Sequence, residues 1–238
     1  MMVLLNLAFR DSPRLFEMKN SAQRTAFLNG EGDAWFERNS HYEVEKFDHV
    51  DNEILLHLPK GNSVLEIGCA DGRRLARIQK ILGTDTKLVG IDPSTTAIKQ
   101  GLTAFQGIDL RIGTADDLPK DELFETVILG FCLYLCDRAL LSKVVSEVDR
   151  VLADDGTLII TDFDPPHPRI RQYRHHEGLW SYKMDYSTLF TALPHFCQSA
   201  KRSMSHQGAD WEMSEGERIA VWVLKKHINA GYSLETDD

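Results

Sequence analysis

The sequence predicts an α/β protein in which a mainly parallel, seven-stranded sheet lies between layers of helices. Two observations support this prediction. Between residues 63 and 163, short apolar runs typical of buried strands alternate with segments of helical spacing. Strands that follow one another through helices form right-handed crossovers and a parallel sheet. Two more apolar runs near the end of the chain complete the seven strands.

The expected elements begin with helices over residues 1–58. Apolar residues recur at helical spacing from His41 to Leu58, and Pro59–Asn62 ends that helix. Strands are then expected at 63–68, 87–92, about 108–112, 125–131, 157–163, 199–206 and 217–225. Before the fifth strand, Asp155 and Gly156 predict a turn, because glycine adopts a positive φ at little cost.

Composition limits the class of protein. At 238 residues the chain suits one large α/β domain. Its 27 basic and 36 acidic residues give a net charge of −9, which argues against the broad basic face of a nucleic-acid-binding protein. No run approaches the roughly 20 apolar residues that span a bilayer, and the four cysteines make no disulfide framework. We therefore expect a cytoplasmic protein with no nucleic-acid or membrane partner.

The stretch Val64–Gly72 is a buried-strand pattern that breaks into a turn of small residues, and Leu88–Asp92 is a second strand that ends on an acid. In an open α/β sheet, a glycine turn after one strand and a carboxylate after the next build a nucleoside-binding crevice. The turn lets the backbone approach the ligand. The Asp92 carboxylate can accept hydrogen bonds from both ribose hydroxyls.

The turn fits some nucleosides better than others. A dinucleotide fingerprint that starts at Gly68 requires glycine at positions 70 and 73, where the chain has Ala70 and Arg73. A phosphate-binding loop requires a Gly-Lys-Ser/Thr run, which the turn lacks. The carboxylates of Glu66 and Asp71 flank the turn and suit a ligand with a positive centre. This points to S-adenosylmethionine (SAM), which carries a sulfonium and an amino group.

At this point the sequence resembles the class I SAM-dependent methyltransferases. Their first motif is an acid followed by three glycines at every second position, and this chain has Glu66, Gly68, Ala70 and Gly72. Ala70 in place of the central glycine is a small departure. The resemblance covers roughly residues 40–163 in detail and continues more weakly to about 226. It implies the three-layer fold of the family, with one antiparallel strand in the last pair, and methyl transfer from SAM.

The resemblance also implies which residues bind the cofactor. Asp92 is expected to hold the ribose, Asp116 the adenine amino group, and Ala115 to offer a backbone contact. The complete expected set is Glu66, Gly68, Cys69, Ala70, Gly72, Asp92, Pro93, Ala115, Asp116, Asp117, Gly130 and Arg38. Simpler interpretations stay open, because Asp92 before a proline can be a helix N-cap, and the acids at 116 and 117 can be solvated loop charges.

Two regions lie outside the common core. Residues 1–58 are expected to be an N-terminal helical extension that packs on a SAM-binding domain of residues 59–238. In that extension, Trp35, Phe36 and Arg38 are candidates to shield the methionine part of SAM and to pair with its carboxylate. The alternative is that the two aromatic rings only anchor the extension on the core.

The second region, about residues 164–194, is an insertion between the fifth and sixth strands. It leaves the carboxyl edge of the sheet, where α/β proteins bind ligands, and long internal loops are functional or disordered. We interpret it as a substrate lid, in which His176 and Tyr173 are the catalytic candidates, because an oxygen or nitrogen nucleophile must lose a proton. Three arginines between residues 169 and 174 either hold an anionic group or form a solvated helix face. Other candidates for a base are His41, Asp162, His167 and His175.

The sequence thus predicts methyl transfer to an oxygen or nitrogen of a small-molecule biosynthetic intermediate, sugar-like or anionic. The fourth strand is followed by Gly130–Tyr134 and lacks the Asn/Asp-Pro-Pro-Tyr/Phe run of enzymes that methylate DNA or protein amides. No metal is expected, and a homodimer stays open. The alternatives are a SAM- or nucleoside-binding regulatory module without catalysis and an NAD-linked oxidoreductase, which Ala70 and Arg73 disfavour.

Overall fold

The computed structural model describes residues 22–40, 48–59, 63–214 and 216–232. His41 and the first part of the helix expected from His41 to Leu58 lie outside these ranges. Among the described residues, no helix is long and apolar enough to cross a membrane.

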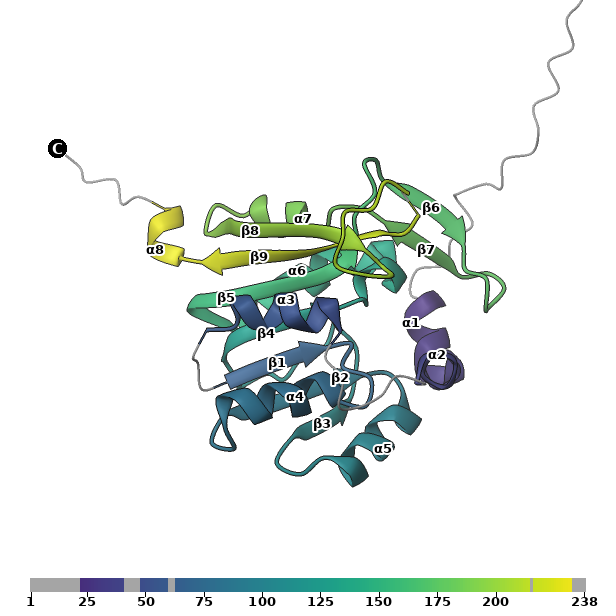
Figure 1. The fold of residues 1–238 in the computed structure, drawn as a ribbon, viewed down its shortest axis with the longest axis horizontal. Helices are drawn as coiled ribbons and strands as arrows, with labels where there is room; N and C mark the ends of the chain where they lie inside the picture. Colours follow the sequence, from purple (N-terminus) through teal and green to yellow (C-terminus); the bar gives the residue numbers. More distant parts are fainter. Residues whose placement is uncertain (1–21, 41–47, 60–62, 215, 233–238) are drawn as a thin grey trace, which may run out of the picture.

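The centre of the molecule is a seven-stranded sheet with the strand order β3-β2-β1-β4-β5-β9-β8 (Figure 1). The strands are β1 (Ser63–Ile67), β2 (Lys87–Asp92), β3 (Asp109–Ile112), β4 (Phe124–Gly130), β5 (Leu152–Phe163), β8 (Phe196–Ser205) and β9 (Arg218–Lys226). Neighbours from β3 to β5 pair in parallel, whereas β9 is antiparallel to both β5 and β8. The predicted sheet, with one antiparallel strand in the last pair, is confirmed.

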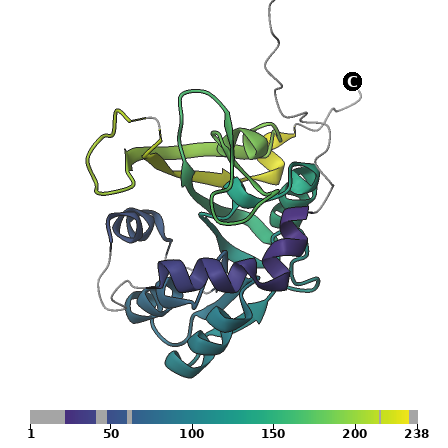
Figure 2. The ribbon, with the colours of Figure 1, turned by 90° about the vertical axis from the view of Figure 1, so that its right-hand side faces the viewer.

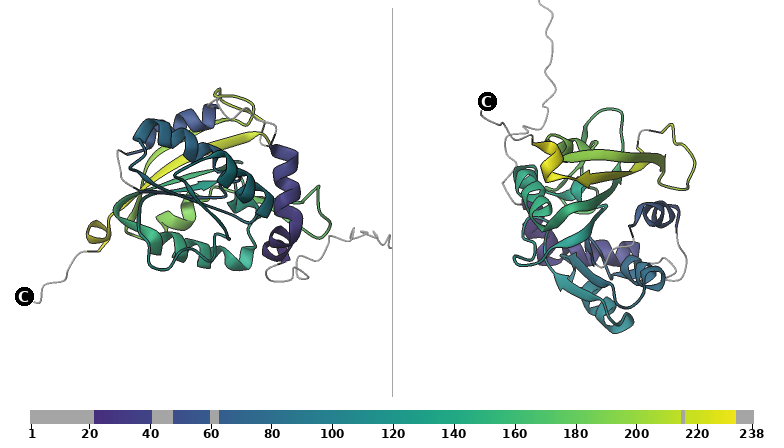
Figure 3. Two further views of the ribbon diagram at one scale, coloured as in Figure 1. Left: turned by 90° about the horizontal axis from the view of Figure 1, so that it is seen from below. Right: turned by 90° about the vertical axis from the view of Figure 1, so that its left-hand side faces the viewer.

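Side chains alternate between the two faces of the sheet and fill two hydrophobic cores. In β1, for example, Leu65 and Ile67 belong to one core and Val64 to the other. Helices cover both faces, which gives three layers (Figure 3). The helices of one layer are α3 (His49–His57), α4 (Arg73–Leu82) and α5 (Thr95–Ala104), and those of the other are α6 (Leu141–Val151) and α7 (Ser187–Thr191).

Residues 22–39 form an N-terminal strap across the carboxyl ends of the parallel strands, drawn in purple in Figure 2. The strap consists of α1 (Ala22–Ala26), the π-helix η2 (Phe27–Glu31) and α2 (Gly32–Asn39). It kinks inside η2, where Gly30 has a φ of 120°. The helical extension predicted for this part of the chain is therefore present, and it lies at the edge of the sheet where ligands bind.

The predicted insertion folds as a β-hairpin of β6 (Arg169–Gln172) and β7 (Trp180–Lys183), which forms a separate two-stranded sheet. The arginines at positions 169 and 171 therefore belong to an exposed strand. The alternative that they form a helix face is wrong, because β6 pairs with β7 residue by residue.

Short elements complete the chain. They are η3 (Leu133–Leu135), η4 (Arg138–Leu140) and α8 (Ile228–Gly231). The turn before the parallel part of β5 differs from the prediction in one respect: Asp155 has the positive φ, 61°. Gly156 is needed for a different reason, because a Cβ there would lie 2.7 Å from the carbonyl oxygen of Ala153.

Candidate functional site

The turn after β1 places backbone where a side chain would not fit. Gly68 has a φ of 77°, and a Cβ there would lie 2.9 Å from the carbonyl oxygen of Gly130. Ala70 also adopts a left-handed conformation, with a φ of 50°. Because Ala70 has a Cβ, this conformation costs about 1 kcal/mol relative to glycine. The structure therefore keeps the shape of a three-glycine turn even though its central glycine is replaced.

Asp92 ties this turn to the end of β2. Its Oδ2 accepts the backbone N–H of Ala70 at 2.9 Å, and its Oδ1 accepts that of Ser94 at 2.8 Å. Burial raises the pKa of Asp92 to about 6. The N-cap of α5 is Ser94, whose Oγ accepts the N–H of Ala97. The N-cap alternative for Asp92 is therefore wrong, and a lone pair on each carboxylate oxygen stays available to a ligand.

Two cavities lie at the carboxyl edge of the sheet, and they share part of their lining. The Asp92 cavity lies under the strap and holds about 830 Å³ of empty space, part of it open to solvent. The Glu66 cavity lies on the other side of the turn, toward α3 and β5. The residues that line both are Trp35, Gly68, Gly130 and Phe131. A ligand bound along the turn can therefore reach from one cavity into the other.

Most of the predicted cofactor residues meet at these cavities. The Asp92 cavity contains Gly68, Asp92, Pro93, Ala115, Asp116 and Gly130. The Glu66 cavity contains Glu66, Gly68, Cys69, Ala70 and Gly130. The predicted residues that line neither cavity are Gly72, Asp117 and Arg38.

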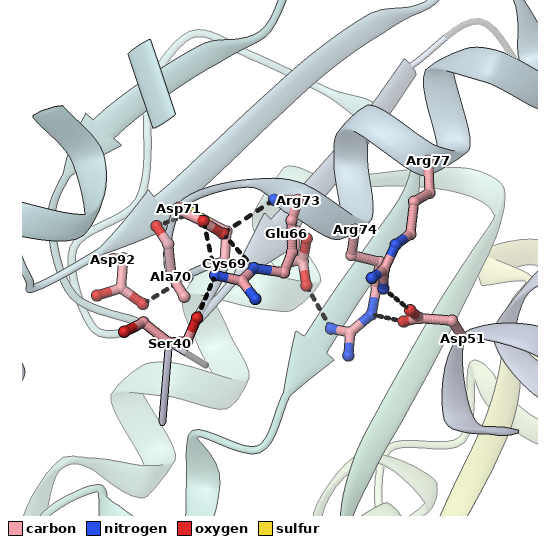
Figure 4. Close-up of polar contacts among 10 residues, drawn as sticks. All are labelled: Ser40, Asp51, Glu66, Cys69, Ala70, Asp71, Arg73, Arg74, Arg77 and Asp92. Carbon is pink, nitrogen blue, oxygen red and sulfur yellow. Dashed lines mark hydrogen bonds and ion pairs between the residues drawn. The ribbon is translucent and has the colours of Figure 1, made fainter. Parts of the chain in front are cut away.

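Glu66 is a buried carboxylate with one unsatisfied oxygen. Its Oε1 accepts a hydrogen bond from Arg74, which also binds Asp51 of α3 at 2.6 Å (Figure 4). Its Oε2 has no hydrogen-bond partner among the described residues. Burial raises the pKa of Glu66 to about 7 although Arg74 opposes this shift. A buried acceptor without a donor lowers the stability of the free protein. A ligand that donates a hydrogen bond to Oε2 would remove this cost.

Asp116 lies in the loop after β3, on the opposite side of the Asp92 cavity. Arg24 of the strap binds its Oδ1 at 3.1 Å, and Lys143 lies 3.6 Å from its Oδ2. Burial alone would raise the pKa of Asp116, but hydrogen bonds from Thr114 and Arg24 outweigh it and lower the pKa. Asp116 is therefore a paired carboxylate that lines the cavity, which rules out the alternative of a solvated loop charge.

The strap is fastened around the Asp92 cavity by carboxylates. Asp137, which follows β4 and η3, accepts the backbone N–H groups of Gln23 at 3.2 Å and Arg24 at 2.8 Å. Asp33 accepts the hydroxyl of Ser94 at 2.7 Å and the N–H of Thr96 at 2.8 Å. Sequence reasoning missed these contacts, because the partners lie 61 to 114 positions apart and no local pattern marks them.

The three side chains of the strap that were candidates to contact SAM lie in different places. Trp35 lines both cavities, whereas Phe36 is buried and lines the Glu66 cavity. Arg38 binds Glu31 at 2.5 Å and the hydroxyl of Tyr173 at 3.1 Å. Its guanidinium is therefore directed to the hairpin side and is not brought to the cofactor residues.

The hairpin does not bring the catalytic candidates to the cavities. His176 is exposed in the β6–β7 turn, and its Nδ1 lies 2.8 Å from the carbonyl oxygen of Glu177. Tyr173 is buried against the strap, and burial raises the pKa of its hydroxyl to about 12. Neither residue lines either cavity, so their catalytic role stays a prediction.

Comparison with known proteins agrees with this geometry. Residues 64–156 match the family model of the methyltransferase domain. Over these residues the chain is a methyltransferase domain, similar to the class I SAM-dependent methyltransferases. The ajmaline N-methyltransferase of Rauvolfia serpentina is 32% identical over 107 residues, which are 42% of this chain and 36% of that protein. The norajmaline N-methyltransferase of the same plant is 27% identical over 110 residues, 44% of this chain and 37% of that protein. The matches thus span little more than a third of these curated relatives.

Solved structures share the fold of this protein. One is the 1,6-didemethyltoxoflavin-N1-methyltransferase of Burkholderia thailandensis with bound S-adenosylhomocysteine (SAH), which superposes with a TM-score of 0.69 at 15% sequence identity. The alignment covers 92% of this chain and 93% of that enzyme. Another is the N-methyltransferase NodS of Bradyrhizobium japonicum, also with SAH, which superposes with a TM-score of 0.59 at 17% sequence identity. The alignment covers 87% of this chain and 99% of NodS. At these identities the similarity establishes the fold alone.

SAM is the cofactor of these similar proteins, and the residues of the two cavities fit it. The free Oε2 of Glu66 suits the amino group, and the two oxygens of Asp92 suit the ribose hydroxyls. Ala115 and Asp116 line the far end of the Asp92 cavity, where the adenine would lie. The decisive observation is the unsatisfied buried oxygen of Glu66, because a cationic donor is the group that would satisfy it.

Binding of SAH should weaken as the pH falls, because Glu66 must be ionised to accept an ammonium group. With a pKa of about 7 in the free protein, its carboxylate is largely ionised at pH 8 and largely protonated at pH 6. We expect the dissociation constant, measured by calorimetry, to rise about tenfold between these values. The Glu66→Gln variant should bind more weakly at pH 8 and lose most of this dependence. An equally steep dependence in that variant would contradict the assignment.

Proposed function

We propose that the protein transfers the methyl group of SAM to a nitrogen of a small molecule. The observation that carries this proposal is the lining that the two cavities share. A cofactor that binds Asp92 in one cavity and Glu66 in the other would pass Gly68 and Gly130, which line both cavities. The rest of the Glu66 cavity then remains for an acceptor. The relatives named N-methyltransferases support nitrogen as the accepting atom.

SAM supplies a methyl group already activated by the sulfonium, so the protein contributes mainly alignment. Asp92 would hold the ribose of the cofactor and Glu66 its amino group, and Trp35 helps to exclude water where the cavities join. An amine that arrives protonated must lose a proton before it attacks. The imidazole of His206, which lines the Glu66 cavity, is the candidate that accepts this proton.

Two measurements test the proposal. Titration with SAH in a calorimeter should show saturable one-to-one binding, and titration with NAD should show none. Transfer from radiolabelled SAM should then occur to members of a panel of primary and secondary amines. It should not occur to the alcohols of the same carbon skeletons.

Each outcome has a distinct meaning. A folded protein that does not bind SAH would contradict the assignment of SAM as the cofactor. SAH binding without transfer to any acceptor would favour the non-catalytic module, and transfer to the alcohols alone would replace nitrogen by oxygen as the accepting atom.

A further inference from the structure

We propose that the Glu66 cavity selects amine acceptors that carry an aromatic ring close to the reacting nitrogen. The ring would pack on an aromatic wall formed by Phe131, Tyr134, Phe163 and His206. This inference rests on the proposed function and deepens it, because it names the class of acceptor.

Each ring of the aromatic wall contacts at least one other ring of the wall. The Phe163 ring lies edge-on to Tyr134, with centroids 5.1 Å apart, and parallel to His206, with centroids 6.0 Å apart and an angle of 7°. Phe131 meets Phe163 and His206 edge-on at 6.2 Å and 5.9 Å. Such offset and edge-on arrangements are the ones that aromatic rings prefer.

The wall is assembled from three separate parts of the chain. Phe131 and Tyr134 follow β4, Phe163 ends β5, and His206 follows β8. Phe131 has a φ of 49°, a conformation that is unusual for a bulky residue. Strain of this kind persists only where the surrounding structure enforces it, and it is concentrated at functional sites. Here the strained residue is Phe131, and its side chain belongs to the lining of both cavities.

Asp162 acts as a positioning residue for the wall. Its fully buried carboxylate accepts the backbone N–H of Tyr134 at 3.2 Å and that of Phe163 at 2.8 Å. The loop after β4 and the end of β5 are thus joined through one side chain. This contact accounts for Asp162 without a role as a base, since Asp162 lines neither of the two cavities.

The charge beside the wall favours an aromatic ring over an ammonium group as its ligand. The Nζ of Lys183 lies 3.3 Å from the centroid of the Phe163 ring and donates to the carbonyl oxygen of Gly216 at 3.0 Å. The Phe163 ring therefore already carries a cation–π contact. A second cation on the same ring would be repelled, whereas a neutral aromatic ring would not. The acceptor is thus expected to place its ring, and not its nitrogen, on Phe163.

The test uses two secondary amines of matched size and shape. One is 1,2,3,4-tetrahydroisoquinoline, which is aromatic, and the other is its saturated counterpart decahydroisoquinoline. Each is titrated by calorimetry into the full-length protein saturated with SAH. We expect the aromatic amine to bind about tenfold more tightly, as stacking contacts typically give. Equal affinities, or no binding of either amine, would overturn the proposal.

Variants of Phe163 test whether the aromatic wall causes the preference for the aromatic amine. Phe163→Leu should remove the preference for the aromatic amine, whereas Phe163→Tyr should retain it. Phe105→Leu, which replaces a half-buried ring outside both cavities, is the matched control and should change nothing. All three variants should bind SAH like the wild type, because neither Phe163 nor Phe105 is among the residues expected to bind the cofactor. A preference that survives in Phe163→Leu would also overturn the proposal.

Two measurements separate this inference from the function on which it rests. Loss of SAH binding in the wild type would refute the proposed function itself. Methylation of both amines with equal KM would leave the function standing and overturn the aromatic site. For Asp162→Asn, a raised KM for the aromatic amine with an unchanged SAH affinity is the result expected of a positioning residue. An unchanged KM would show that Asp162 has no such role.

Discussion

Replacing Asp92 with alanine is expected to weaken SAH binding by a factor of about 100 to 10,000. A hydrogen bond to a charged acceptor contributes roughly 1.5–3 kcal/mol, and the ribose would lose two of them. The variant also frees the backbone N–H of Ala70 that Asp92 now binds, so the turn itself becomes less ordered. Calorimetric titration with SAH measures the effect directly.

The control for this variant is Asp109→Ala. Asp109 is an exposed acid of β3 that binds Arg111 and lines neither cavity, so its loss should leave the SAH affinity within about twofold. The Asp92 variant should still fold, because burial raises the pKa of that carboxyl and its ionised form therefore costs stability at neutral pH. An unchanged SAH affinity in Asp92→Ala, with a normal thermal transition, would contradict the ribose assignment.

Replacing Gly101 with alanine is expected to lower the free energy of unfolding by about 3 kcal/mol, as overpacking in a rigid core does. Gly101 lies in α5 where that helix meets the glycine turn. A Cβ there would lie 2.1 Å from the carbonyl oxygen of Asp71 and 2.5 Å from Leu110 Cδ1. The oxygen belongs to backbone, which cannot rotate away, so either α5 or the turn must shift. Urea denaturation followed by circular dichroism measures the loss.

The same variant should also weaken SAH binding, because the turn is part of the binding site. Gly208→Ala is the matched control: a Cβ at Gly208 meets nothing within 4 Å and its φ is not in the left-handed region. Its unfolding free energy should change by less than about 0.5 kcal/mol. If the two alanine variants proved equally stable, the close contact between α5 and the turn would not exist in solution.

The sequence alone was sufficient for the parallel sheet, the glycine turn and the acid at the end of β2. These features are local. A buried parallel strand requires a continuous apolar run, and a tight turn beneath a ligand requires residues such as Gly68 that accept a positive φ. The order of such elements along the chain then fixes which strand ends lie together. The spacing of Glu66, Gly68 and Asp92 was therefore enough to identify the cofactor edge of the sheet.

Sequence reasoning was less successful where contacts join distant segments. It left open whether Asp92 caps a helix, and the structure decides this because Ser94 takes that role. It placed His176 and Arg38 near the ligand, but the pairing of β6 with β7 holds His176 in an exposed turn, and Glu31 and Tyr173 hold Arg38. No local pattern encodes these partners.

The methyl donor and the acceptor thus differ in how they are encoded. The proposed donor site depends on backbone conformation and on one acid per strand end, which are properties of short segments, so the sequence alone predicts it. The aromatic wall depends on rings from β4, β5 and the segment after β8, brought together by the sheet order and fastened by Asp162. Only the tertiary structure decided that arrangement, because contacts between segments up to 75 positions apart arise when the strands pair.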